Sequence, residues 1–137
     1  MSRWMCLDVG SKRIGVAVTD PLKITARPLT TFRRQNLSQD VGQLCKIIAE
    51  YQIEKLVVGK PLHLSGRESS TLKIIEPLIS QLREMIKIEV KWAEERLSTK
   101  EAEQIMAKKN LSIKERRLRR DEFSAAVILQ WYLSEIK

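Results

Sequence analysis

Two short apolar runs joined by a tight turn open the chain, and they constrain its fold more than any other feature. Residues 4–9 end with an aspartate and a valine and are followed by Gly10, and residues 14–19 are rich in β-branched side chains. Because β-branched residues favour strands and residues 11–13 leave room only for a tight turn, this pattern predicts a β-hairpin. A third strand is expected near residues 26–32.

The rest of the chain alternates between helical and strand patterns. Apolar residues recur at helical spacing over residues 36–51, and Ser98 with Glu101 matches the Ser-x-x-Glu capping box of a helix start. Three early strands followed by this alternation predict one α/β domain over residues 1–137 with a mixed sheet. The further expected elements are strands at 55–59 and 86–93, helices around 72–82, over 98–108 and from 121 onward, and a basic connection at 110–120.

The charge and the cysteines bound what the chain can do. Lysine and arginine number 25 against 17 acidic residues, a net charge of +8, and 43% of the residues are hydrophobic, so the chain can bury a core and still attract a polyanion. No apolar run is long enough to span a membrane, and the N-terminal residues do not match a secretory signal. Cys6 and Cys45 lack the spacing of a disulfide scaffold or a zinc site, which predicts a cytoplasmic protein.

Acidic residues fall at the ends of predicted elements. Asp8 ends the first strand, Glu94 and Glu95 end the last strand, and Asp121 begins the final predicted helix. If these strands run parallel, their carboxyl ends meet at one edge of the sheet, where sites on α/β sheets occur. Grouped carboxylates with almost no histidine favour Mg²⁺ or Mn²⁺, and two such ions about 4 Å apart can hydrolyse a phosphodiester.

Each acid also has a structural reading. A lone carboxylate in the apolar strand is costly to bury, which favours a functional role for Asp8. Asp121 is equally well explained as a helix N-cap. Glu94 and Glu95 are adjacent in a strand and point to opposite faces, so at most one of them is needed in a site.

A basic segment lies directly before Asp121. Between residues 108 and 120 there are seven lysines and arginines and one acid. Beside an acidic metal site, such a segment can bind a phosphate backbone, although charge runs are more often solvated faces. The predicted phosphate-binding residues are Lys114, Arg116, Arg117, Arg119 and Arg120, together with Lys12 and Arg13 in the first turn. Aromatic residues are few, and Trp4, Trp92, Trp131 and Tyr132 are expected in the core.

Four segments resemble the YqgF family, also called RuvX, whose members are RNase H-like proteins regarded as pre-16S rRNA nucleases or Holliday junction resolvases. The likeness covers nearly the whole chain. The segments are residues 7–17, residues 57–62 with Gly66, residues 94–99, and Asp121 with residues 124–133.

The resemblance implies an RNase H-like fold, with three antiparallel N-terminal strands in a mixed central sheet flanked by helices. It also implies a nuclease centre in which Asp8, Glu95 and Asp121 hold Mg²⁺ or Mn²⁺, and the chemistry above predicts two ions. Glu94 replaces the aspartate usual in that motif. Arg96 matches the motif's arginine and is expected to contact a phosphate or to hold the acids in place.

The expected function is metal-dependent cleavage of structured RNA in the 5′-end processing of pre-16S rRNA. Two alternatives remain at this point: a resolvase acting on four-way DNA junctions, and a non-catalytic nucleic-acid-binding protein. A junction resolvase favours a symmetric dimer, but the sequence offers no heptad pattern, so a monomer or a weak homodimer is expected. An actin-like phosphotransferase is disfavoured because 137 residues hold only one of the two domains it requires.

Overall fold

The computed structural model describes residues 2–61, 68–95 and 98–135; within these ranges the side chains of residues 61, 68–71, 94, 95, 98 and 99 are outside the description. Strands and helices follow one another in the order that the sequence pattern predicts. The elements are β1 (Arg3–Val9), β2 (Arg13–Thr19), β3 (Ala26–Arg33), α1 (Leu37–Glu50), β4 (Ile53–Pro61), α2 (Glu68–Met85), β5 (Glu89–Glu95), α3 (Ser98–Lys108) and α4 (Ile113–Glu135).

The five strands form one mixed sheet in the order β3-β2-β1-β4-β5. β1 pairs antiparallel with β2, and β2 pairs antiparallel with β3. β4 pairs parallel with both β1 and β5. The expected α/β architecture with three antiparallel N-terminal strands is therefore confirmed, and the carboxyl ends of β1, β4 and β5 lie at the same edge.

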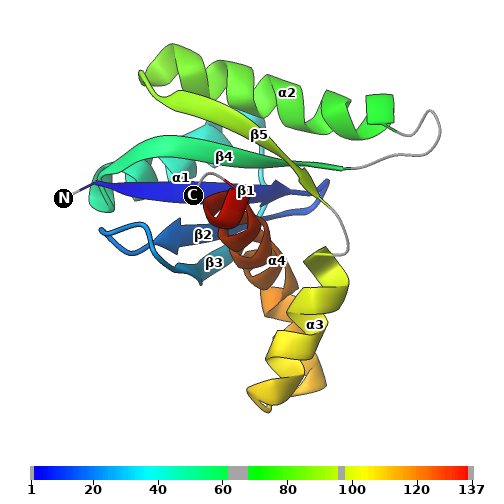
Figure 1. Ribbon diagram of the computed structural model, residues 1–137. Coiled ribbons are helices and arrows are strands. Elements are labelled where there is room, and N and C mark those ends of the chain that lie inside the picture. Colours follow the sequence, from blue (N-terminus) through cyan, green and yellow to red (C-terminus); the bar gives the residue numbers. More distant parts are fainter. Residues whose placement is uncertain (1, 62–67, 96–97, 136–137) are drawn as a thin grey trace.

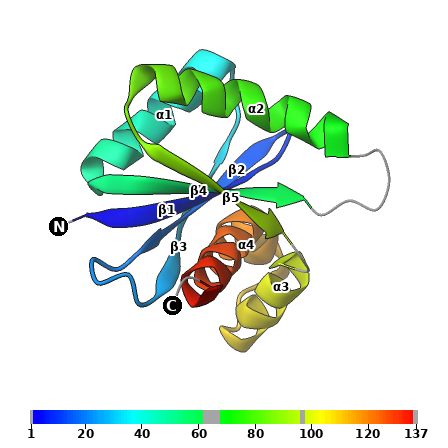
Figure 2. The same cartoon turned by 45° about the horizontal axis from the view of Figure 1, so that its top comes forward.

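Helices cover both faces of the sheet: α1 and α2 lie on one side, and α4 with α3 beside it lies on the other (Figures 1 and 2). Alternation along β1 divides its side chains between these two layers. Met5 and Leu7 join the core under α1 and α2, whereas Cys6 packs with Ala125 and Ile128 of α4. Asp8 has the same parity as Cys6, so its carboxylate belongs to the α4 face.

Helix α1 begins and ends close to its predicted limits because a side chain caps it. Asn36 is the N-cap, and its side-chain oxygen accepts a hydrogen bond from the Gln39 amide at 2.9 Å. Helix α2 contains Pro77 within its span. Trp92 contradicts the expectation of a core aromatic, since it lies on the edge strand β5 and is 39% exposed.

The predicted start of the last helix is wrong. Residues 113–120 are the first turns of α4 rather than a connection, so Asp121 lies inside a helix and is not its N-cap. A reciprocal capping box sets the true start: the Glu115 amide donates to the Ser112 hydroxyl, and the Ser112 amide donates to the Glu115 carboxylate, both at 3.1 Å. The basic residues of this segment are therefore held on a helix.

Candidate functional site

A glycine brings Asp8 and Asp121 together. In the β1–β2 ladder Asp8 lies opposite Gly15. A Cβ atom added at Gly15 would overlap the carbonyl group of Asp121 and lie 2.6 Å from its Cβ atom. The backbone of α4 therefore rests directly on β2 at the residue that pairs with Asp8, which makes the two predicted acids neighbours.

The β3 residue that pairs with Gly15 also contacts α4. Gly15 pairs with Thr31 of β3, and the Thr31 hydroxyl accepts a hydrogen bond from the Glu122 amide at 3.0 Å. Gly15 thus contacts Asp121, and Thr31, its partner on β3, contacts Glu122. Sequence reasoning did not single out Gly15, although a glycine within a β-branched strand is a signal for close approach of another backbone.

The Asp121 carboxylate lies in a partly desolvated position. Burial raises the pKa of Asp121 above its ordinary value of 3.8, while the positive charges of Arg13 and Arg120 act to lower the pKa. Asp8 is likewise half-buried. A carboxylate whose ionised form is disfavoured by burial gains from a nearby cation, so this position suits a ligand of a hard metal ion.

The third predicted acid is located by its backbone. Glu95 ends β5 opposite Pro61, and Glu94 lies opposite Lys60. In the same register, Ala93 packs in the core layer beneath α4, and Glu95 is two residues further along. The side chains of both glutamates lie outside the described ones. Among the side chains that are described, no group of three histidine, cysteine or acidic residues could hold a metal ion.

A buried hydroxyl lies one helical turn beyond Asp121. Ser124 is fully buried, and its oxygen has no hydrogen-bond partner among the described residues. Residues three apart on a helix share a face, so Ser124 lies next to Asp121 along α4. The sequence analysis had quoted Ser124 only as part of a motif. Its unused hydrogen-bonding capacity adds a polar group to this edge of the core.

The predicted phosphate-binding cations fall into two groups. Three of them are engaged within the protein: the Arg116 guanidinium donates to the Leu111 carbonyl at 3.0 Å, Arg119 pairs with Glu122 at 3.2 Å, and Arg120 pairs with Glu103 at 2.7 Å. The Arg120–Glu103 pair ties α4 to α3, whereas the Arg119–Glu122 pair lies within α4. Four exposed cations make no ion pair with a described residue: Lys12, Arg13, Lys114 and Arg117. Arg96 lies outside the described residues.

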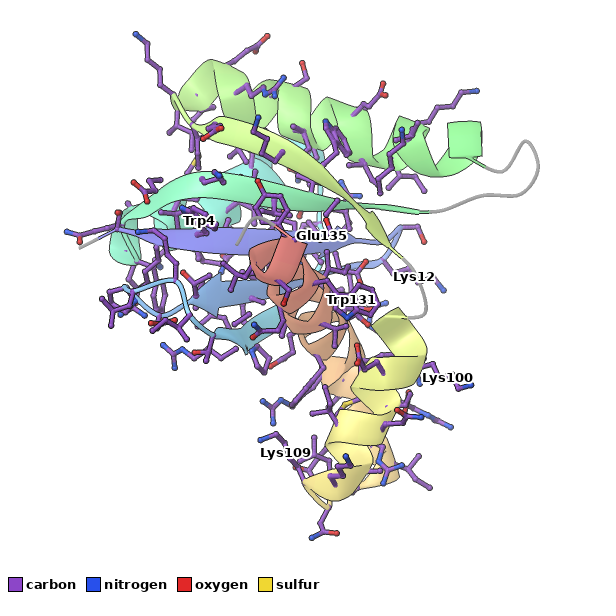
Figure 3. All side chains as sticks on the ribbon, in the orientation of Figure 1. Trp4, Lys12, Lys100, Lys109, Trp131 and Glu135 are labelled. Atoms are coloured by element: carbon purple, nitrogen blue, oxygen red, sulfur yellow. The ribbon has the colours of Figure 1, made fainter. Side chains whose placement is uncertain are left out.

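These four cations lie on two parts of the chain near the acids. Lys12, labelled in Figure 3, is in the turn between β1 and β2, and Arg13 is the first residue of β2. Lys114 and Arg117 precede Asp121 by seven and four residues, which places all three along one face of α4. Figure 1 shows that these first turns of α4 extend beyond the sheet together with α3.

No helix in the described ranges is long and apolar enough to cross a membrane. Cys6 and Cys45 are not joined in a disulfide.

Comparison with known proteins places these observations in a family. A family model described as "RuvX: Holliday junction resolvase" matches residues 2–135. A curated protein of Desulforamulus reducens is 40% identical over 96% of both chains, and one of Roseiflexus sp. is 39% identical over 96% of this chain and 93% of its own. Both carry the name "Putative pre-16S rRNA nuclease".

Solved structures support the fold. Fowlpox virus resolvase, solved with Holliday junction DNA, aligns with a TM-score of 0.61 at 11% identity and 98% coverage of both chains. RuvC of T. thermophilus, solved with a Holliday junction substrate, aligns with a TM-score of 0.56 at 12% identity, covering 97% of this chain and 96% of its own. The chain has the resolvase-like RNase H fold and belongs to the RuvX family.

Proposed function

We propose that the protein is a metal-dependent nuclease that hydrolyses phosphodiester bonds in the 5′-end processing of pre-16S rRNA. Its sequence similarity to curated proteins with that name extends over nearly the whole chain. The observation that carries the proposal is the contact between Gly15 and Asp121, which makes Asp8 and Asp121 neighbours at the edge where the parallel strands end.

The donor set at this edge fits Mg²⁺ or Mn²⁺. Asp8 and Asp121 offer only oxygen ligands, and burial raises the pKa of Asp121, so an added positive charge relieves the cost of its ionisation. We assign Glu95 as the third ligand because it has the parity of Ala93, which belongs to the α4 face; Glu94 has the opposite parity. When bound, two such ions supply positive charge to the attacking and leaving oxygens of a phosphodiester.

The chain's own cations hold the substrate in this proposal. Lys12, Arg13, Lys114 and Arg117 make no ion pair with a described residue and bind backbone phosphates on both sides of the acids. Arg116, Arg119 and Arg120 fix the α3–α4 pair and contact phosphates with their remaining donors, and Arg96 adds a further contact. Recognition is through the backbone and the shape of structured RNA, in the cytoplasm, by a monomer or weak homodimer.

Cleavage assays on two substrates test this proposal. Purified protein is incubated with Mg²⁺ or Mn²⁺ and either a pre-16S rRNA fragment that spans the 5′ processing site or a four-way DNA junction. We expect divalent-ion-dependent cleavage of the RNA. Cleavage of the junction alone would instead support a resolvase, a reading favoured by the description of the matching family model.

Two matched variants locate the activity. Asp8→Asn removes a proposed ligand, whereas Asp20→Asn removes a carboxylate from the β2–β3 loop. We expect Asp8→Asn to lose cleavage while it still binds RNA, and Asp20→Asn to cleave normally. If Asp8→Asn cleaves like the wild type, the assigned site is wrong. If the wild type binds RNA but cleaves neither substrate, the protein is a binding module.

A further inference from the structure

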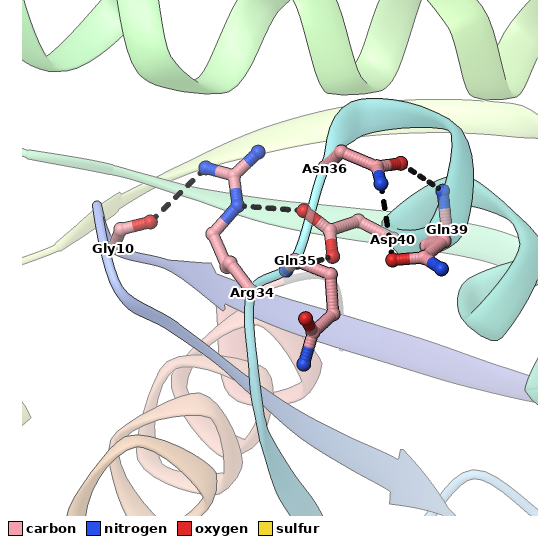
Figure 4. Close-up of polar contacts among 6 residues, drawn as sticks. All are labelled: Gly10, Arg34, Gln35, Asn36, Gln39 and Asp40. Carbon is pink, nitrogen blue, oxygen red and sulfur yellow. Dashed lines mark hydrogen bonds and ion pairs between the residues drawn. The ribbon is translucent and has the colours of Figure 1, made fainter.

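A largely buried ion pair joins Arg34, in the connection after β3, to Asp40 in the first turn of α1. The Nε atom of Arg34 lies 3.0 Å from Oδ2 of Asp40, and the two side chains are only 14% and 3% exposed (Figure 4). Desolvation offsets much of the attraction within such a pair, so the pair by itself says little about stability. The further hydrogen bonds that Arg34 and Asp40 make with neighbouring backbone groups are more informative.

Both partners make further contacts, and these lead to the β1–β2 turn. The second carboxylate oxygen of Asp40 accepts a hydrogen bond from the Gln35 amide at 3.0 Å, which orients the carboxylate. The Nη1 atom of Arg34 donates to the Gly10 carbonyl at 3.1 Å. The Arg34 amide donates to the Lys12 carbonyl at 2.8 Å. One residue therefore contacts the turn from both its side chain and its backbone.

The turn that is held in this way is next to the proposed active site. Gly10 follows Asp8 after a single residue, and the Gly10 amide donates to the Arg13 carbonyl at 2.9 Å, which closes the turn. The turn therefore sets the direction in which β1 ends and the place where Lys12 and Arg13 emerge. A displacement of about 1 Å in such a group can cost about a hundredfold in rate.

We propose that Arg34, oriented by Asp40, is a positioning residue that fixes the β1–β2 turn and thereby holds Asp8 and Arg13 in their working geometry. This inference rests on the proposed nuclease function. A guanidinium is required because its rigid, planar group of donors reaches the Asp40 carboxylate and the Gly10 carbonyl together. An ammonium group keeps the charge but lacks this geometry.

The test compares Arg34→Lys with a matched arginine at the other end of the same hairpin. Arg3 of β1 donates from Nη1 to the Thr19 carbonyl of β2 at 3.2 Å, so Arg3→Lys removes the same type of guanidinium–carbonyl contact away from the site. For Arg34→Lys we expect kcat to fall by about 10–100-fold with a smaller change in KM. For Arg3→Lys we expect kcat to stay at the wild-type value.

Amide hydrogen exchange, followed residue by residue by NMR without substrate, gives a readout independent of activity. We expect faster exchange of the Gly10 and Arg34 amides in Arg34→Lys and unchanged exchange there in Arg3→Lys. Asp40→Asn is a second variant, since it keeps an oxygen for the Gln35 amide and loses the charge that orients Arg34. We expect it to show the same two effects.

Two results would overturn the inference. Wild-type exchange of the Gly10 and Arg34 amides in both Arg34→Lys and Asp40→Asn would show that the pair does not hold the turn. Faster exchange with a wild-type kcat would show that the position of the turn does not matter for catalysis. Failure of the proposed function is distinguishable, because then the wild-type protein itself cleaves nothing while the exchange measurement still decides whether Arg34 holds the turn.

Discussion

The Lys55 cluster at one end of the central sheet and the Asp121 carboxylate at the other differ in how their charges are accommodated. At the end where β1 and β4 begin, the Lys55 ammonium lies 4.0 Å from the centre of the Trp4 ring and donates to the Tyr132 hydroxyl at 3.4 Å. Lys23 pairs with Glu54 at 3.2 Å. At the end where β1 finishes, the Asp121 carboxylate is partly buried, and its pKa is raised by that burial more than the charges of Arg13 and Arg120 lower it.

We interpret the charges of Lys55, Lys23 and Glu54 as structural, and that of Asp121 as available to bind a ligand. Where a charge is paired within the protein, the free energy of that interaction contributes to the stability of the fold. At the edge near Asp121, burial disfavours the ionised carboxylate, so the protein bears part of its desolvation cost until a cation binds. The four predictions that follow test this contrast.

Loss of one proposed ligand has the largest expected effect. Asp121→Asn should lower the cleavage rate by more than about a hundredfold, since even loss of a group that only supports a metal ligand costs 10–100-fold. The metal-free variant should be at least as stable as the wild type, because burial disfavours the ionised carboxyl of Asp121. Single-turnover cleavage and urea unfolding measure the two effects. Wild-type cleavage by this variant would break the contrast.

The close contact between β2 and α4 comes next. Gly15→Ala places a Cβ atom against the Asp121 backbone, and the helix must move. Overpacking of this kind costs about 1–3 kcal/mol in the free energy of unfolding, and we expect cleavage to fall with it.

Gly42→Ala is the matched control for that variant. Nothing lies within 4 Å of a Cβ atom added at Gly42, which is in helix α1. Alanine there should raise the free energy of unfolding by about 0.5–1 kcal/mol and leave cleavage unchanged. Equal effects of the two substitutions on stability would contradict the close packing at Gly15.

A substitution at the end of the sheet where β1 and β4 begin should change the stability of the protein but not its cleavage rate. Lys55→Met keeps the apolar stem of the side chain but loses the cation between Trp4 and Tyr132. We expect a loss of about 1 kcal/mol in the free energy of unfolding, the usual size of a cation–π contact. Cleavage should not change. A variant that folds normally but cleaves slowly would show that this end also belongs to the functional surface.

The smallest expected effect is a difference in pH dependence between the two ends. Hydrogen bonds from the backbone, the Thr25 amide foremost, lower the pKa of Asp20, whereas burial raises the pKa of Asp121. The contribution of Asp20 to stability is therefore present above pH 3.8 and is lost as pH falls through its folded-state pKa.

Asp121 has the opposite sign. In the metal-free protein the folded state favours its neutral form, so stability falls as pH rises from 3.8 through the folded-state pKa. Urea unfolding at pH values on both sides of 3.8 measures this, with EDTA present. Asp20→Asn should weaken the decline at low pH, and Asp121→Asn should remove the decline at higher pH. The same sign for both variants would contradict the assignment.

The strands and the first hairpin were predictable because their signals are local. β-branched residues, the tight first turn and alternating elements each depend on neighbours in the chain. The start of α4 had a local signal too, since Ser112 and Glu115 match the same capping-box pattern that correctly predicted the helix at residue 98. It was missed because the basic turns that follow lack apolar periodicity.

The candidate site was predictable only as residue types. The acid at the end of β1 stood out because an apolar strand does not otherwise need one. Its contact with α4 through Gly15, and the link from Asp40 through Arg34 to the first turn, join residues far apart in sequence. Such contacts depend on tertiary packing, which periodicity and propensity do not encode.

The contact between Asp121 and Gly15 also determines when, during synthesis and folding, the proposed site can form. A chain is synthesised from its N-terminus, so the strand with Asp8 emerges long before the helix with Asp121. Contacts between distant parts of a sequence form late because closing a long loop is entropically costly. The proposed acidic centre is therefore completed only when α4 docks on β2. A nascent or partly folded chain has Lys12 and Arg13 of the first turn but lacks the contact that brings Asp121 to Asp8.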